Sequence, residues 1–195
     1  MPPAKSSFSS SRGFSLVEVV IAMGILTTVS LGVAQLFAVS THANMVARGQ
    51  TSTNAMAEQK IEQLRSLTWG FDLQGQGLPV TDTTTNLAKY PHEADGRGLN
   101  PSPSNSLDKN IDGYVDFLDA TGQWVGTGDT PPQNAVFVRR WAVVPLPTNP
   151  NNTIVLQVLV SPLSNEMAKT ATQDNVRRRM PGDTLLTSVK TRKAQ

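Results

Sequence analysis

A single carboxylate inside a long apolar run limits what this chain can fold into. Residues 14–39 are mostly apolar and contain no proline, and Glu18 carries the one formal charge between Gly13 and Ala47. As a helix the run would be roughly 39 Å long, at about 1.5 Å per residue, which is enough to cross an apolar membrane core of about 30 Å. A carboxylate at the centre of a bilayer costs about 2.5–3.5 kcal/mol, so we expect Glu18 to have a function.

Three simpler explanations account for only part of this run. A secretory signal peptide would have a shorter apolar region, no internal carboxylate and a small-x-small cleavage site soon after it. An ordinary membrane anchor would explain the length of the run, but neither Glu18 nor the break at Arg12-Gly13. A glutamate that merely lies near the lipid surface would explain the carboxylate and leave the break unexplained.

The residues around that break, "RGFSLVEVVIAMGIL", resemble the N-terminal signature of type IV prepilins and pseudopilins, position for position over residues 13–26. In that family an inner-membrane peptidase removes a short basic leader that ends in glycine, and the next residue is then N-methylated. The resemblance implies a cytoplasmic leader over residues 1–13, cleavage between Gly13 and Phe14, and Glu18 as the fifth residue of the mature chain.

The resemblance also implies a role for Glu18 in assembly. When many such helices pack into a fibre, the carboxylate can neutralise the N-terminal amine of a neighbouring subunit, and an ion pair of this kind specifies register more than it adds stability. The implied partners are other pilin or pseudopilin subunits, the prepilin peptidase and an inner-membrane assembly platform. The implied location is the bacterial inner membrane, crossed once by residues 14–40, with the head in the periplasm and later in a fibre.

The helix is predicted to continue as an amphipathic half over residues 41–68. Met45, Gly49, Met56, Ile61 and Leu64 recur near one face, which predicts that this half packs against a folded head. The same stripe also fits a short coiled coil. The segment "AEQKIEQLRSL" is similar to the corresponding stretch of minor pilins.

The remainder, residues 69–195, is predicted to form a β-rich head. Residues 70–107 are rich in Gly, Pro, Asn, Thr and Ser and indicate long loops with one short strand. Strand patterns follow in "YVDFL", "QWVG", "AVFVRRWAVV", "TIVLQVLV" and "DTLLTSVKT", and the third and fourth of these predict an antiparallel hairpin. The predicted fold class is α+β, with a long N-terminal helix packed on a C-terminal antiparallel sheet.

One loop, "DKNIDGYVDFLD", resembles the calcium loop of an EF-hand. The ligands implied by this resemblance are Asp108, Asn110, Asp112, Asp116, Asp119 and the carbonyl of Tyr114, with Gly113 at the sharp turn. The last ligand is Asp rather than the longer Glu, and the flanks do not resemble helices. The alternative is an Asp-Gly turn leading into a strand at 114–118, with solvated acidic residues.

Charge and motifs exclude several classes of function. Without residues 1–13 the chain has 17 − 2 = 15 basic against 15 acidic residues, so nothing indicates nucleic-acid binding. The charges are uneven: residues 72–119 carry eight acidic and three basic groups, and residues 139–195 carry nine basic and three acidic groups. There is no cysteine, and no nucleophile elbow, phosphate loop or metalloprotease motif, so we expect no enzyme.

These patterns favour a structural protein, a minor pilin of a type IV pilus. The alternatives are a minor pseudopilin of a type II secretion system and a membrane-anchored, calcium-dependent binding module.

Overall fold

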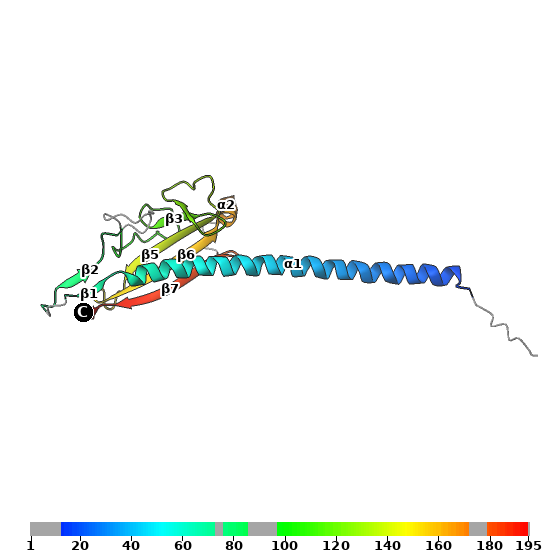
Figure 1. The fold of residues 1–195 in the computed structure, drawn as a ribbon, viewed down its shortest axis with the longest axis horizontal. Coiled ribbons are helices and arrows are strands. Elements are labelled where there is room, and N and C mark those ends of the chain that lie inside the picture. The colour runs from blue at the N-terminus through cyan, green and yellow to red at the C-terminus, as the bar shows by residue number, and fades with distance from the viewer. Residues whose placement is uncertain (1–12, 73–75, 86–96, 172–178, 195) are drawn as a thin grey trace, which may run out of the picture. The chain divides into compact units, whose positions relative to one another are not determined.

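The computed structural model describes residues 13–72, 76–85, 97–171 and 179–194. Its elements are α1 (Leu16–Ser66), β1 (Trp69–Phe71), β2 (Pro79–Thr81), β3 (Val115–Leu118), β4 (Trp124–Gly126), β5 (Phe137–Pro145), β6 (Thr153–Pro162), α2 (Leu163–Ala171), β7 (Thr184–Thr191) and β8 (Lys193–Ala194) (Figure 1). The chain divides into two compact units, Met1–Met45 and Val46–Gln195. The predicted α+β class, with a long N-terminal helix and a C-terminal antiparallel sheet, is confirmed.

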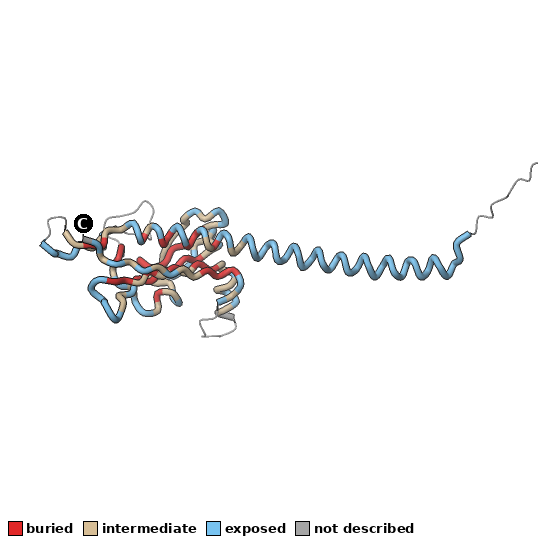
Figure 2. The backbone as a smooth tube through the Cα atoms, turned by 90° about the horizontal axis from the view of Figure 1, so that it is seen from below, coloured by how far each residue is buried: buried red, intermediate tan, exposed pale blue. Residues whose placement is uncertain are grey.

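Helix α1 runs unbroken through a stretch that contains no proline. The β-branched residues of its first half are weak helix formers, and Thr27 and Thr28 donate their hydroxyls to the carbonyls of Met23 and Gly24, one turn earlier. The helix ends at Ser66, close to the end predicted from the amphipathic pattern. Figure 2 shows the change in surroundings along the helix, from exposed residues in the first half to a buried face in the second.

The main sheet of the head has five strands in the order β4-β3-β5-β6-β7, and all its neighbouring strands are antiparallel. The predicted hairpin is the longest pairing, with Phe137 opposite Pro162 at one end and Pro145 opposite Ile154 at the other. The strands predicted near residues 114–118, 123–126 and 183–191 are β3, β4 and β7. Helix α2 and strand β8 were not predicted, and two short strands, β1 and β2, lie where the loop region was expected to hold one.

A second, smaller sheet has the order β2-β1-β8. Strand β1 pairs with β2 in antiparallel fashion and with β8 in parallel. Strand β8 follows β7 directly in the chain, so this pairing brings the C-terminal end of β7 beside the end of α1.

The core lies between the second half of α1 and one face of the main sheet. Buried residues of α1, among them Ala57 and Leu64, pack with Trp141 of β5 and Val158 of β6. The opposite face carries a smaller cluster of Val115, Phe117 and Val138, against which Leu163 of α2 packs. The buried positions of α1 are Thr53, Met56, Ala57, Lys60, Ile61 and Leu64, and they follow the spacing of a helix that faces a core.

Candidate functional site

The N-terminal site consists of Gly13 and Phe14, which precede α1, and Glu18 in the first turn of the helix. All three residues are exposed, and Phe14 is 82% exposed. No atom approaches within 4 Å of the position that a Cβ would occupy on Gly13, so the Gly13–Phe14 peptide bond stands clear of the described residues. A peptide bond that is exposed and outside a helix is open to a protease. The leader predicted over residues 1–13 lies, apart from Gly13, outside the described residues.

The carboxylate of Glu18 lies where the field of its own helix favours it. The amide of Val19 donates to the carbonyl of Ser15, at 3.2 Å, which places Glu18 in the first turn. The N-terminal end of a helix carries a partial positive charge that stabilises a nearby anion. The structure therefore gives Glu18 a favourable position within one chain and leaves its side chain accessible to a second chain.

The first half of α1 has an apolar surface that water would solvate poorly. An 18-residue window of the helix reaches a mean hydropathy of 2.1, with none of it buried, and by length and composition the helix is able to cross a membrane. The exposed fraction is 67% for Leu26, 71% for Leu36 and 70% for Phe37. A continuous apolar surface of this extent marks a site that lipid or another protein covers.

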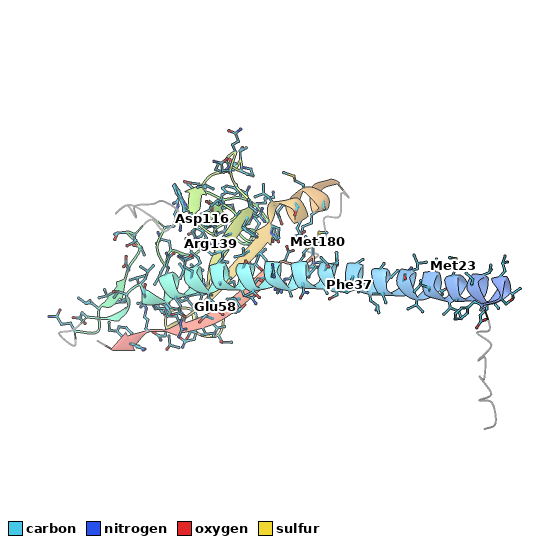
Figure 3. The ribbon with its side chains drawn as sticks, turned by 45° about the vertical axis from the view of Figure 1, so that its right-hand side comes forward. Met23, Phe37, Glu58, Asp116, Arg139 and Met180 are labelled. Carbon is cyan, nitrogen blue, oxygen red and sulfur yellow. The ribbon has the colours of Figure 1, made fainter. Side chains whose placement is uncertain are left out.

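The second half of α1 is fixed to the sheet by a buried ion cluster of Lys60, Asp116 and Arg139. Lys60 Nζ lies 3.0 Å from Oδ2 of Asp116, and Arg139 donates to both oxygens of the same carboxylate, each at 2.9 Å. The side chains of all three residues are exposed by 5% or less. Asp116 and Arg139 are opposite each other on β3 and β5, and Figure 3 shows both beside the second half of α1. The cluster therefore joins the helix to two strands.

Further contacts complete this cluster. Arg139 also donates to the carbonyl of Met56 and to the side chain of Gln59, both on α1. Lys60 Nζ lies 3.7 Å from the centroid of the Trp141 ring, a distance at which the ring attracts a cation. The hydrogen bonds of Arg139 to α1 and the ring beneath Lys60 offset part of the cost of removing these charges from water.

The cluster holds two cations and one anion, and its pKa values reflect this imbalance. Burial, together with the nearby Arg139, lowers the pKa of Lys60 from 10.5 to about 8, against the attraction of Asp116. Burial acts to raise the pKa of Asp116, but the attraction of Lys60 and Arg139 outweighs it and holds that pKa below its usual value. Asp116 is therefore an anion at neutral pH, and the lowered pKa of Lys60 lies close to neutral pH.

Hydrogen bonds at two places join β7 to α1 and to Leu67, which follows the helix. Near one end of the strand, Thr184 bonds with the hydroxyl of Thr53 at 2.8 Å and donates to Asn54, also at 2.8 Å. Near the other end, Lys190 donates to the carbonyls of Arg65 and Leu67, the first of these at 2.7 Å. The last carbonyls of a helix have no partner within the helix, and a lysine beside them satisfies them and neutralises the helix dipole.

Two of the predicted calcium ligands have other partners in the structure, and Asp116 shows this most clearly. Asp116 belongs to β3, where both its oxygens are bound by Lys60 and Arg139 inside the core. The carbonyl of Tyr114, the predicted main-chain ligand, accepts the amide of Trp141 at 3.0 Å. A calcium ion at Asp116 would have to displace two buried cations, so these residues are structural.

The other predicted ligands point to different partners. Asn110 accepts a hydrogen bond from Arg140 and donates to the carbonyl of Asp129. One oxygen of Asp119 accepts the amides of Thr121 and Gln123 within its own turn. Asp108 and Asp112 are exposed. Over the described ranges, no group of three or more His, Cys, Asp or Glu side chains is placed to hold a metal ion, and calcium binding by this loop stays a prediction that these contacts do not favour.

The alternative prediction for the same segment is confirmed for the turn and the strand, but its solvated acidic residues are wrong for Asp116, which is buried. Gly113 has a φ of 80°, which only glycine adopts without strain, and the amide of Tyr114 donates to the carbonyl of Ile111 across the turn. The chain then enters β3 at Val115. The segment is an Asp-Gly turn that leads into a strand.

The comparisons with known proteins concern the N-terminal site. Residues 8–34 match the family model described as the prokaryotic N-terminal methylation motif. The chain carries this methylation motif. The matched residues include Gly13, Phe14 and Glu18, together with the first part of the apolar helix. The chain matches no curated protein and no solved structure.

The methylation motif is consistent with a type IV prepilin-like protein and supports a pilin-like or pseudopilin role. It implies processing by a prepilin peptidase and assembly with other pilins. The exposed apolar helix that follows the motif fits a pilin anchored in the inner membrane.

The ion cluster is the part of the molecule that the sequence analysis missed. The signal was present, because Lys60 lies one helical turn from both Met56 and Leu64, on the apolar face of the helix. A lysine in the middle of a face that packs on a sheet requires an acidic partner there. The sequence offered that partner in Asp116, to which the calcium loop assigned another role.

Proposed function

We propose that this protein is a minor pilin, a structural subunit of a type IV pilus. The observation that carries the proposal is the methylation motif at the start of an exposed apolar helix whose second half is joined to a folded head. Prepilin peptidase cuts after Gly13, Phe14 becomes the methylated N-terminus, and residues 14–40 anchor the subunit in the inner membrane with the head in the periplasm. The protein acts by packing into a fibre and not by catalysis.

In this proposal Glu18 sets the register of the subunit. It neutralises the N-terminal amine of a neighbouring chain inside the apolar fibre core. A charge that leaves water without a partner carries a penalty of several kcal/mol, so subunits in the wrong register are strongly disfavoured. The exposed position of Glu18 in the first turn supports this role, since its carboxylate is accessible to a second chain.

Incorporation into fibres tests the proposal. We expect Glu18→Ala to be processed and inserted in the membrane but to be lost from sheared pili. Glu58→Ala is the matched control, because Glu58 is an exposed glutamate of the same helix, and it should enter pili at the normal level. Pili that contain Glu18→Ala at the level of the unchanged chain would refute the assembly role of Glu18.

The same motif also supports a minor pseudopilin of a type II secretion system. Deletion of the gene separates the two functions. A minor pilin predicts loss of pili or of their surface properties with normal protein secretion, and a minor pseudopilin predicts the reverse.

A further inference from the structure

Strand β7 forms an open edge of the main sheet. It is the last strand in the order β4-β3-β5-β6-β7, and over the described residues it pairs with β6 alone. The amide of Arg192 donates to the carbonyl of Asn152 on the β6 side, at 2.9 Å. Main-chain groups of an antiparallel strand point alternately to its two sides. The amides and carbonyls of Leu185, Thr187, Val189 and Thr191 therefore point away from the sheet, and we call this row the β7 edge.

A basic pocket lies at the end of this edge, where β7 approaches the end of α1. Its volume is about 310 Å³. Its walls include Arg65, Trp69, Val189, Lys190, Thr191 and Lys193. Three of the residues that line the pocket are cationic and none is acidic, while Leu67, Trp69 and Val189 supply apolar surface. A pocket with this composition favours an anionic group carried on a partly apolar chain.

The charges of the basic pocket are only partly compensated within the chain. Lys190 is bound to the carbonyls of Arg65 and Leu67, and Arg65 pairs with Glu62 at 2.8 Å on the exposed side of α1. Burial lowers the pKa of Lys190, and the like charges of Arg65 and Lys193 lower it further, against the weaker attraction of Asp82. A carboxylate in the pocket would relieve this repulsion.

We propose that the β7 edge and the basic pocket together bind an extended acidic segment of a partner protein. The segment adds to β7 as a further strand, through the outward amides and carbonyls of Thr187, Val189 and Thr191. One of its carboxylates enters the basic pocket between Lys190 and Lys193. Strand addition supplies affinity through the main chain, and the pocket supplies selectivity for acidic sequences.

The geometry favours a polypeptide over a nucleic acid. Proteins that bind single strands of nucleic acid stack the bases on exposed aromatic rings, whereas Trp69, the aromatic residue of the pocket, is 5% exposed. An extended peptide also matches the repeat of the β7 edge, because its own main-chain groups alternate with the same spacing. This site lies in the head and does not involve the methylation motif. The peptide-binding proposal is therefore independent of the proposed function.

Peptide binding to the full-length chain in detergent micelles tests the proposal. The probe is a fluorescent octapeptide in which glutamate alternates with threonine and valine, and its anisotropy measures binding. We expect saturable binding, with amide chemical shifts that change along residues 185–191. The same peptide with N-methyl groups on alternate amides should not bind, because it cannot pair with a strand edge, and neither should a peptide with lysine in place of glutamate.

Charge reversal in the protein tests the pocket itself. Lys193 is exposed, so Lys193→Glu should leave the fold intact and weaken binding about fivefold or more, the loss expected for an ion pair of about 1 kcal/mol. Lys109→Glu, an exposed lysine in a loop, is the matched control and should bind normally. Equal binding of the N-methylated peptide would overturn the proposal, as would displacement of the probe by an equal concentration of inorganic phosphate or of a short oligonucleotide.

Discussion

The two halves of α1 belong to one helix but bury their side chains in different ways. Residues 16–45 are all exposed, although most of them are apolar (Figure 2). Residues 46–66 are richer in polar side chains, yet they have a buried face that contains Thr53 and Lys60. Exposed fraction therefore does not follow apolarity along this helix. The second half packs on its own head, whereas the described part of the chain covers none of the apolar surface of the first half.

The difference shows which contacts a chain completes by itself. In the second half, the buried Lys60 and Thr53 have partners inside the molecule, in the ion cluster and on β7. Oε1 of Gln63 is the exception, because it is buried with no hydrogen-bond partner among the described residues. In the first half, we expect other molecules to cover the apolar surface and to supply the partner of Glu18. Substitutions in the second half should therefore change the stability of the head, and substitutions in the first half should change assembly.

The largest effect is expected from Asp116→Ala. This change leaves Lys60 and Arg139 buried without their carboxylate, and breaking a buried ion pair in this way costs about 3–5 kcal/mol. The free energy of unfolding of the full chain in detergent, followed by tryptophan fluorescence in urea, measures the loss. The matched control is Asp112→Ala, at an exposed position of the preceding turn, which should change that free energy by less than about 0.5 kcal/mol. Equal unfolding midpoints for the two variants would contradict a structural role for Asp116.

A pair of leucines on α1 compares its two halves directly. Leu64 is fully buried, so Leu64→Ala should lower the free energy of unfolding of the head by about 3 kcal/mol through lost burial and a cavity. Leu36 is 71% exposed, and Leu36→Ala should leave that free energy unchanged in detergent. The same urea titration measures both. If Leu36→Ala lowered the free energy of unfolding of the head as much as Leu64→Ala, the first half of α1 would also stabilise the head, contrary to our prediction.

The pH dependence of the free energy of unfolding tests whether Lys60, the second cation of the ion cluster, has a lowered pKa. Because the pKa of Lys60 is lowered in the folded state, the unfolded chain binds more protons between about pH 8 and 10.5, and the free energy of unfolding should rise with pH in that window. The expected rise is on the order of 1–2 kcal/mol by pH 10. Lys190, whose pKa is also lowered, contributes with the same sign, and Tyr114, whose pKa is raised, opposes it at higher pH.

The variant Lys60→Met isolates the contribution of this lysine. It leaves Asp116 and Arg139 as an ion pair with no net charge. Because methionine fills a similar volume, the free energy of unfolding at pH 7 should be unchanged or higher. Between pH 8 and 10, the free energy of unfolding of this variant should rise less than that of the unchanged chain. If the two pH profiles coincide, Lys60 does not titrate as its surroundings indicate.

The smallest effect is expected at the end of α1. Lys190→Met removes the donor to the carbonyls of Arg65 and Leu67 and should lower the free energy of unfolding by about 1 kcal/mol. Lys193→Met, which changes an exposed lysine of the following strand, is the control. Amide hydrogen exchange near residues 63–66 measures the local effect, which should be faster exchange in Lys190→Met alone. Unchanged exchange in that variant would show that Lys190 does not cap the helix.

Much of the fold could be predicted from local patterns. The apolar run, the amphipathic continuation and the alternating segments at residues 135–144 and 153–160 each contain their own periodicity. The helix and these strands were therefore found near their observed bounds. Helix α2 was missed because its nine residues form too short a pattern. Strand β8 was missed because two residues acquire their structure from pairing with β1, far away in sequence.

The residues of the candidate sites also differ in whether a local pattern reveals their role. Gly13, Phe14 and Glu18 form a compact motif that can be recognised without knowing the fold. Asp116 cannot be interpreted so locally, because its spacing from Asp108 and Asp112 suits a calcium loop, whereas the register of β3 and β5 places it opposite Arg139. Cross-strand register is a long-range property, and it decided the role of this carboxylate.

The intact mass of the protein from inner membranes, with and without the prepilin peptidase, shows whether the chain is cut after Gly13. We predict a chain that begins at N-methylated Phe14 when the peptidase is present, and the full-length chain with residues 1–13 when it is absent. Gly13→Val should give the unprocessed mass in both strains. An uncut N-terminus in the strain that contains the peptidase would contradict the account, because the methylation motif would then have no role in the maturation of this protein.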